Sequence, residues 1–446
     1  MEQKTGGARV CALKILYKIE QEGAFANIAL KEAPGLRALS APDRGLVTTL
    51  VYGCVRYKRY LDYIITQFSS VKLKKLSPYV LLLLRMGTYQ IMKLDRVPDR
   101  AAVDECVKLA GKYAYRSKGF VNAVLRKIAA QKQQIRLPEE TAQRLGVQYS
   151  YPDEIVSAWL DAYGAAFTEE LLAAGNESAP LTVRVNTLKT DETSLTERLK
   201  TEGVHVENAN VAGMLSLGGT EIPALESYRA GLFTPQGMAS YLAGAVLAPR
   251  PGDTVLDLCA APGGKSTHLA ELMQNKGNVY AFDIHAHKIA LIEQNAARLG
   301  INIITAAQAD ASVPMERFFG CADAVLADVP CSGLGIIRKK PDIKWGFDAA
   351  GQDALAELQY RILSAAGRYV KAGGTLVYST CTIAEKENNA VVERFLRENG
   401  DFALDGFADV LPDKMQKTTA KDGYIQFFPH TDGIDGFFIC RMKRKS

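Results

Sequence analysis

The chain has 446 residues, of which 48% are hydrophobic and 23% are charged, with a formal net charge of +5 at pH 7. This length predicts two or three domains, and this composition is ordinary for a globular protein. The N-terminal MEQKTGGARV lacks the apolar core of a signal peptide, and the apolar run YVLLLLRM at 79–86 is too short to span a bilayer. We therefore expect a cytoplasmic protein with no membrane partner.

The charge is distributed unevenly along the chain. Residues 1–150 carry 26 Lys and Arg against 12 Asp and Glu, whereas the remainder carries 28 against 37, so the two parts have net charges of +14 and −9. Basic residues gain affinity for nucleic acids by displacing counterions from phosphates. Charge alone leaves two alternatives open for the basic part, namely RNA or DNA binding and a solvated lysine-rich surface.

The cysteines and histidines show no metal-binding pattern. The eight cysteines include no C-x-x-C pair, and the five histidines include no H-E-x-x-H spacing. We therefore expect no metal site and no disulfide framework.

Residues 1–140 read as helices. Apolar residues recur with a 3.6-residue period over 43–68, which predicts a helical segment. A second helical segment at 117–128 begins at Ser117, a suitable N-cap, and ends with Arg126 and Lys127, which suit a helix C-terminus. This part is predicted to be an all-α domain.

Residues 141–235 give a mixed pattern. The segment YPDEIVSAWLDAYG at 151–164 predicts a helix, and the alternating LTVRVNTL at 181–188 predicts a strand. We predict a small α+β connector here.

Residues 236–446 alternate short apolar runs with amphipathic helices. A turn signal, PRPG at 249–252, comes before the first run. The predicted strands lie at 254–260, 278–284, 301–310, 322–330 and 373–382, and the predicted helices begin at Ser266 and cover 287–300 and 385–400. This alternation predicts an α/β domain with a parallel sheet covered by helices on both faces, in which ligands bind beyond the carboxyl ends of the strands.

Polar side chains stand at the ends of these runs. They are Asp257, Asp283, Asp310, Asp328 and Cys381. One such aspartate is more often a helix cap than a ligand. Because five of them stand in register, we expect them to converge at one edge of the sheet and to form a site.

The stretch CAAPGGKST at 259–267 predicts a ligand-binding turn. A nucleotide-triphosphate loop requires glycine where Cys259 stands, which argues against an NTPase, and the dinucleotide motif G-x-G-x-x-G is absent. Gly263 and Gly264 permit close backbone approach, and Asp283 follows Gly264 by 19 residues, a distance suited to binding a ribose diol. This pair fits NAD or S-adenosylmethionine. Because S-adenosylmethionine has no phosphate, Asp283 and an adenine-side Asp310 would suffice, which favours the methyl donor.

The residues predicted to bind S-adenosyl-L-methionine are Cys259, Ala260, Ala261, Pro262, Gly263, Gly264, Lys265, Asp283, Asp310 and Asp328.

Three motifs resemble a known family. DLCAAPGGKST at 257–267, DVPCSG at 328–333 and YSTCT at 378–382 resemble, in this order, the RNA cytosine-5 methyltransferases of the Nol1/Nop2/Sun group. The helical segments DRGLVTTLVYGCVRYKRYLD and RSKGFVNAVLRKI resemble the RNA-binding antitermination factor NusB. The two resemblances together extend over nearly the whole chain. Their combination is similar to the bacterial small-subunit ribosomal RNA methyltransferases of the Fmu/Sun type.

The resemblance implies three domains: a NusB-like RNA-binding domain at 1–140, an α+β connector at 141–235 and a Rossmann-like class I methyltransferase domain at 236–446. It also implies methylation of C5 of a cytosine in 16S ribosomal RNA, and we expect the enzyme to be a monomer. Two alternatives stay open: a transfer RNA cytosine-5 methyltransferase, and an RNA-binding assembly or antitermination factor whose methyltransferase fold is not catalytic.

C5 of cytosine is a poor nucleophile until a thiolate adds to C6. The residues alone leave both Cys331 and Cys381 open as the source of that thiolate. The resemblance implies that Cys381 is the nucleophile, that Cys331 takes part in releasing the methylated product, and that Asp328 hydrogen-bonds the ring near N3.

The segment GIIRKKPDIKWG at 335–346 leaves the fourth predicted strand. Arg338, Lys339 and Lys340 are candidate contacts for RNA phosphates. Trp345 is interpreted as packing within a loop, because an isolated aromatic residue is a weak signal for base stacking.

Overall fold

The computed structural model describes residues 7–219 and 221–446. The chain forms two compact units: one is the chain up to Glu177 together with Ile337–Phe347, and the other is Ser178–Ile336 together with Asp348–Ser446. A short segment between two strands of the second unit thus belongs to the first unit. The domain boundaries at 140 and 235 stay a prediction.

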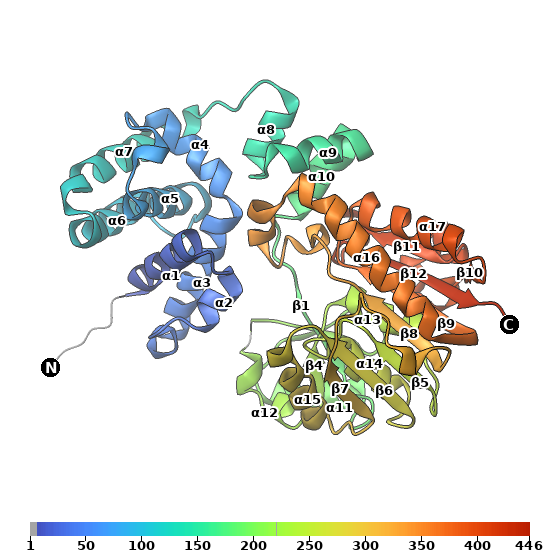
Figure 1. The fold of residues 1–446 in the computed structure, drawn as a ribbon. Helices are drawn as coiled ribbons and strands as arrows, with labels where there is room; N and C mark the ends of the chain where they lie inside the picture. Colours follow the sequence, from blue (N-terminus) through green and yellow to red (C-terminus); the bar gives the residue numbers. More distant parts are fainter. Residues whose placement is uncertain (1–6, 220) are drawn as a thin grey trace. The chain divides into compact units, whose positions relative to one another are not determined.

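The first unit is helical, as predicted (Figure 1). Its α-helices are α1 (Ala8–Glu22), α2 (Ala26–Lys31), α3 (Ala41–Arg56), α4 (Lys58–Phe68), α5 (Pro78–Lys93), α6 (Asp99–Tyr113), α7 (Lys118–Gln131), α8 (Thr141–Gln148), α9 (Asp153–Tyr163) and α10 (Ala165–Ala174). The apolar run at 79–86 falls in α5, which packs against α1, α3, α4, α6 and α7. No helix within the described ranges is long and apolar enough to cross a membrane.

One expected helical stretch is broken. The apolar period over 43–68 is continuous, yet α3 ends at Arg56 and α4 begins at Lys58. Tyr57 stands between them with φ −103° and ψ 19°, and its ring stacks on Tyr89 of α5 at a centroid distance of 6.2 Å. Periodicity did not reveal this break, because the apolar residues keep helical spacing on both sides of it.

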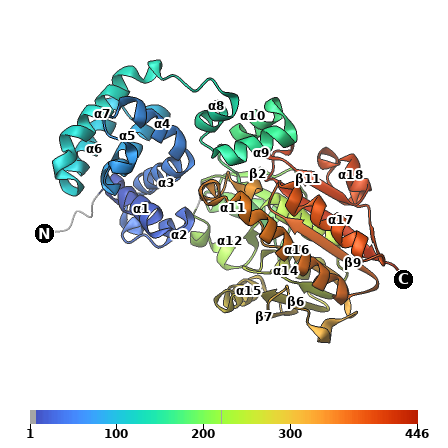
Figure 2. The ribbon, with the colours of Figure 1, turned by 45° about the horizontal axis from the view of Figure 1, so that its top comes forward.

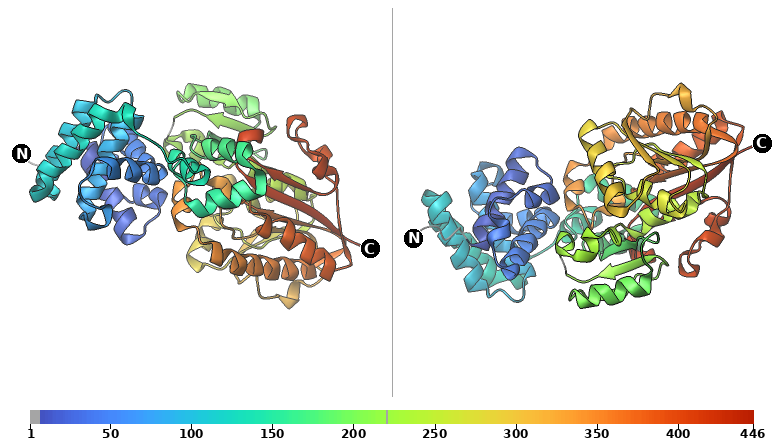
Figure 3. Two further views of the ribbon diagram at one scale, coloured as in Figure 1. Left: turned by 90° about the horizontal axis from the view of Figure 1, so that it is seen from above. Right: turned by 90° about the horizontal axis from the view of Figure 1, so that it is seen from below.

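The second unit begins with a small antiparallel sheet. Its strands are β1 (Leu181–Val185), β2 (Val206–Asn208), β3 (Met214–Leu217) and β4 (Phe233–Pro235), in the order β2-β3-β1-β4. Helix α11 (Glu192–Thr201) lies beside this sheet (Figure 3) and buries Leu195 and Leu199 against it. The predicted strand at 181–188 and the α+β character of the connector are confirmed.

The main sheet of the second unit has eight strands. They are β5 (Thr254–Asp257), β6 (Asn278–Asp283), β7 (Ile304–Gln308), β8 (Ala322–Asp328), β9 (Val370–Thr380), β10 (Phe402–Leu404), β11 (Tyr424–Phe427) and β12 (Phe437–Arg444). The order is β10-β12-β9-β8-β5-β6-β7, with β11 paired to β12. Strands β5 to β9 are parallel, which confirms the predicted sheet, and β12 runs antiparallel to β9.

Helices cover both faces of this sheet. Helices α13 (Met238–Leu247), α14 (Gly264–Leu272) and α15 (Ala286–Leu299) precede β7 in the chain, and α16 (Ala349–Tyr369) and α17 (Asn389–Glu398) flank β9. Figure 2 shows α16 and α17 side by side along one face. In β8, Ala324 and Leu326 face one core while Val325 and Ala327 face the other. Burial on both faces explains why the strand reads as a continuous apolar run.

The strand order places the binding edge. Strand β5 lies between β6 and β8. From β5 the chain adds β6 and β7 on one side of the sheet and then returns to add β8 and β9 on the other side, so the direction of strand addition reverses between β5 and β8. Ligands of doubly wound sheets bind outside the carboxyl ends of the strands at such a reversal. Asp257 ends β5 and Asp328 ends β8, so both lie at this point.

Candidate active site

The turn after β5 has the conformation that its glycines predict. Gly263 has a φ of 97°, which side-chain-bearing residues rarely adopt, and an added Cβ would lie 3.1 Å from the Cα of Ile292. Gly264 begins α14, and nothing lies within 4 Å of where its Cβ would be. The backbone N–H of Ala261 donates to Asp283 Oδ2 at 3.3 Å, which ties the turn to the end of β6.

Four predicted aspartates surround this turn. Burial raises the pKa of the Cys259 thiol, and the charges of Asp257, Asp328, Asp283 and Asp310 raise it further. The sheet therefore brings these carboxylates around one loop, as their strand-end positions predicted. The raised pKa keeps Cys259 protonated at neutral pH, so it is unsuited to act as a nucleophile.

Asp283 and Asp310 differ in exposure. Asp283 is 7% exposed and accepts a hydrogen bond from the backbone N–H of His285 at 3.0 Å. Asp310 is exposed, and hydrogen bonds from the hydroxyl and the backbone N–H of Ser312 lower its pKa. Each carboxylate oxygen has capacity for more than one donor. Both groups therefore keep acceptor capacity for a ligand.

Asp257 is fully buried, and burial raises its pKa to about 6 while Ser266, its hydroxyl donor at 2.7 Å, opposes the shift. In the unfolded chain its pKa is about 3.9. The folded state binds this proton more tightly, so stability falls as pH rises from about 4 through 6.

We expect Asp257→Asn to raise the unfolding free energy of the second unit by about 1–3 kcal/mol at pH 7.5, with the gain disappearing below about pH 4. Thermal unfolding followed across pH 4–8 measures this, with the exposed Glu393→Gln as the matched control. A gain that does not change with pH would show that Asp257 does not titrate in this range.

Two cysteines meet at the ends of β8 and β9. These strands are paired in parallel with Asp328 opposite Ser379, so the residues that follow them leave the sheet side by side. The sulfur atoms of Cys331 and Cys381 lie 3.1 Å apart. The hydrogen bond to Cys381 raises the pKa of Cys331 well above its usual value, and burial and the charge of Cys381 add to this. These effects favour the thiol form of Cys331.

Asp328 joins this pair to the glycine turn. Lys265 Nζ donates to its Oδ2 at 2.7 Å, and Ser379 Oγ donates to its Oδ1 at 2.7 Å. Burial alone would lower the pKa of Lys265, but the carboxylate of Asp328 more than offsets this and raises it. The site thus holds a permanent ammonium group, which the charge of Cys381 also stabilises.

The segment at 337–347 belongs to the helical unit. Trp345 Nε1 donates to the carbonyl of Val55 at 2.7 Å, so Trp345 packs as predicted. Arg338 is only 7% exposed, which argues against its predicted role as a phosphate contact. Lys344 is fully buried, its Nζ donates to the carbonyl of Arg56 at 2.8 Å, and burial lowers its pKa.

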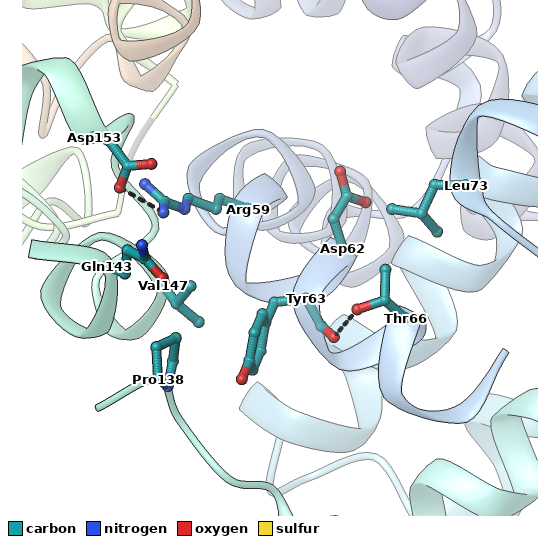
Figure 4. Close-up of a pocket in the computed structure, with 9 residues that line it drawn as sticks. All are labelled: Arg59, Asp62, Tyr63, Thr66, Leu73, Pro138, Gln143, Val147 and Asp153. Carbon is teal, nitrogen blue, oxygen red and sulfur yellow. Dashed lines mark hydrogen bonds and ion pairs between the residues drawn. The ribbon is translucent and has the colours of Figure 1, made fainter. Parts of the chain in front are cut away.

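The helical unit has a pocket of its own, with a volume of about 340 Å³, beside α4 (Figure 4). Its Arg59 is paired with Asp153 at 2.6 Å, and its Asp62 receives both a 2.6 Å and a 2.7 Å hydrogen bond from Arg85. Tyr63 donates to the carbonyl of Arg136 at 3.0 Å. Because these groups are satisfied within the unit, we assign the pocket to the packing of α4 against the residues that follow α7.

The fold and the site define a class. The fold is a Rossmann-like methyltransferase fold, because strands β5 to β9 are parallel, a glycine turn follows β5, carboxylates lie at the ends of the neighbouring strands, and the turn lacks the phosphate-loop motif. Within the residues described, no group of three or more His, Cys, Asp or Glu side chains can hold a metal ion.

Comparisons with known proteins name the family. The family model described as 16S rRNA methyltransferase RsmB/F matches residues 244–443, that of the NusB family matches 7–130, and that of an RsmF/B-like ferredoxin-like domain matches 151–215. A probable ribosomal RNA small subunit methyltransferase B of Bacillus subtilis is 40% identical over 99% of this chain and 100% of its own. Its counterpart in Synechocystis is 36% identical over 98% and 99%. The chain belongs to the RsmB/F family of 16S rRNA methyltransferases.

Solved structures agree with the fold. The crystal structure of PH0851 has a TM-score of 0.82 and 26% identity, and the match covers all of both chains. NSun6 from Pyrococcus horikoshii, solved with SFG, has a TM-score of 0.60 and 22% identity over 67% of this chain and 99% of its own. Together with the family models matched at 7–130, 151–215 and 244–443, this confirms the predicted order of a NusB-like domain, a connector and a methyltransferase domain.

Four residues that contact the site were not singled out from the sequence. They are Ser379, Gln359, Glu387 and Asn388, which hydrogen-bond to Asp328 or to residues beside Cys331 and Cys381. Ser379 had a signal, because in a strand it shares a face with Cys381 two positions later. Glu387 and Gln359 had none, because their partners lie 28 or more residues away, and Asn388 was hidden inside a predicted continuous helix.

Proposed function

We propose that this protein transfers a methyl group from S-adenosylmethionine to C5 of a cytosine in 16S ribosomal RNA through a covalent bond between Cys381 and C6. The observation that carries the proposal is the 3.1 Å pair of Cys331 and Cys381 sulfur atoms next to the Lys265–Asp328 ion pair. Formation and cleavage of a thioether require one sulfur that attacks and a second group that can donate a hydrogen bond to it, and two sulfur atoms at this distance can divide these roles.

The glycine turn supports S-adenosylmethionine as the methyl donor. The four carboxylates around the turn would repel a triphosphate. They can accept hydrogen bonds from a ribose diol and attract a cationic sulfonium ligand. The residues proposed to hold it are those predicted from the sequence, from Cys259 to Lys265 with Asp283, Asp310 and Asp328. S-adenosylmethionine supplies an electrophilic methyl group on sulfur and leaves as S-adenosylhomocysteine.

Cys381 is proposed to start the reaction. Its thiolate donates an electron pair to C6, the C5–C6 double bond opens, and C5 becomes able to attack the methyl carbon. Negative charge then builds toward N3 of the ring. Asp328 is proposed to bind the base near N3, where its carboxylate can accept a hydrogen bond from the neighbouring amino group, and the Lys265 ammonium bound to Asp328 supplies the compensating positive charge.

Cys331 is proposed to act in product release. C5 loses its proton to a base, the electron pair restores the C5–C6 double bond, and the Cys381 sulfur leaves as a thiolate. The thiol of Cys331 lies 3.1 Å from that sulfur and can donate a hydrogen bond to it as it departs.

The RNA is proposed to be held partly by the basic residues of the helical unit. If they form six or more phosphate contacts, affinity should fall about a thousandfold between 50 and 200 mM salt. Filter binding of 16S rRNA across this range measures the slope. If affinity does not change with salt, the basic residues only form a solvated surface and do not contact RNA phosphates. A cytosine in paired RNA must also leave its stack before Cys381 can reach C6.

The proposal is tested by methyl transfer from radiolabelled S-adenosylmethionine to 16S rRNA, followed by bisulfite mapping of rRNA from cells that lack the protein. We expect incorporation into 16S rRNA and the loss of one 5-methylcytosine signal. Incorporation into transfer RNA alone would assign a different substrate. RNA binding with no methyl transfer would identify a non-catalytic assembly factor.

A further inference from the structure

We propose that Glu387 and Asn388 are positioning residues that clasp the two cysteine loops, Glu387 holding the loop of Cys331 and Asn388 the loop of Cys381. This Glu387–Asn388 clasp sets the separation of the two thiols. The inference rests on the proposed function and adds two residues to it.

Glu387 holds the loop that contains Cys331. Its side chain is fully buried, and its Oε2 accepts a hydrogen bond at 2.9 Å from the backbone N–H of Ser332, the residue after Cys331. Gln359 Nε2 of α16 donates to the same Oε2 and to the carbonyl of Pro330, each at 2.9 Å. Glu387 and Gln359 thus fix the backbone on both sides of Cys331.

Asn388 holds the loop that contains Cys381 in the same way. Its side chain is 1% exposed, and its Oδ1 accepts a hydrogen bond from Thr380 Oγ1 at 2.6 Å. Its Nδ2 donates to the carbonyl of Thr382 at 3.2 Å and to Gln426 Oε1 at 2.8 Å. The asparagine therefore binds the residues before and after Cys381.

The two loops are joined because the clasp residues are neighbours in the chain. The Cα atoms of consecutive residues are about 3.8 Å apart, so the two loops cannot separate without breaking one set of these bonds. A hydrogen bond of 2.7 Å between Ser332 Oγ and Thr382 Oγ1 links the loops a second time. Tyr378 of β9 also donates to the carbonyl of Glu387 at 2.6 Å, which ties the clasp to the sheet.

A helix is interrupted to build this arrangement. The sequence predicts one helix over 385–400, but a 3₁₀ helix ends at Glu387 and α17 begins at Asn389. Asn388 lies between them with φ −110° and ψ −99°, outside helical geometry. Side chains of successive residues in a continuous helix point about 100° apart. The interruption allows Glu387 and Asn388 to serve two adjacent loops.

The charge of Glu387 also acts on Cys331. The pKa of Cys331 is raised first by its hydrogen bond to Cys381, then by burial and the charge of Cys381, and further by Glu387. Glu387 thus favours the thiol form of Cys331, the form that can donate a hydrogen bond to the sulfur of Cys381.

The decisive variant is Glu387→Gln, with Glu385→Gln as its matched control, because Glu385 is an exposed glutamate of the same 3₁₀ helix. We expect Glu387→Gln to slow turnover about 10–100-fold, because the hydrogen bonds that orient the Cys331 loop are weakened, while the RNA–protein adduct accumulates on denaturing gels. Asn388→Ala should instead slow formation of the adduct. The control should match the unmodified enzyme.

A second measurement does not depend on methylation. In a Cys381→Ala background, the pH midpoint for alkylation of Cys331 by iodoacetamide should fall by about one unit in Glu387→Gln. Glu387→Asp should keep the midpoint high, because it keeps the charge. If Glu387→Gln fails to fold, Gln359→Leu removes the bond to Pro330 with Glu387 in place and should also accumulate adduct.

If folded Glu387→Gln turns over normally and its pH midpoint for Cys331 alkylation is unshifted, the proposed role of the Glu387–Asn388 clasp is wrong. If the unmodified enzyme methylates no RNA, the proposed function fails, yet the alkylation midpoint still decides whether Glu387 governs Cys331.

Discussion

Cys381→Ala should abolish methyl transfer and the covalent RNA adduct, with a loss of about a thousandfold or more, because no other group in the site supplies the attacking thiolate. Cys331 cannot replace it: its sulfur lies 3.1 Å away, and it sits in a loop held by Glu387 and Gln359. Tritium transfer to 16S rRNA and denaturing gels of labelled RNA measure both losses.

The matched control is Cys321→Ala, which removes an exposed cysteine of the same unit. It should retain full activity. An active Cys381→Ala enzyme would remove Cys381 from the mechanism, and transfer of the adduct to Cys331 would show that the two thiols exchange roles.

Cys331→Ala should have the opposite effect on the adduct. The Cys381–C6 bond should still form, because its thiolate is untouched, but it should break slowly without a thiol donor 3.1 Å from the departing sulfur. We expect stable RNA–protein adduct after methyl transfer and turnover lowered by about a hundredfold or more.

Gel-shifted labelled RNA, counted over time after one round of transfer, measures this release. Cys331→Ser separates the causes, because a hydroxyl keeps a donor at the same position and should release product faster than Cys331→Ala. Release at the normal rate in Cys331→Ala would end the assigned role of Cys331.

Several features of the protein are determined by the sequence itself. The apolar runs that end in Asp257, Asp283 and Asp328 specify parallel strands, and parallel strands bring their carboxyl ends to one edge. The convergence of these residues thus follows from a local pattern repeated along the chain. The glycine turn is equally local, because the positive φ of Gly263 depends on its lack of a side chain.

Other features were decided only by the tertiary structure. Trp345 packs on the helical unit, Lys265 pairs with Asp328, and Glu387 holds the loop of Cys331. Each of these contacts joins residues distant in sequence. Which buried polar groups pair with one another is decided when the core packs, because leaving a buried polar group without a hydrogen bond costs about 1–3 kcal/mol of folding free energy. Local periodicity does not specify those partners. The strand pattern therefore determines where the site lies, whereas the packing of the second unit decides how its two thiols are held.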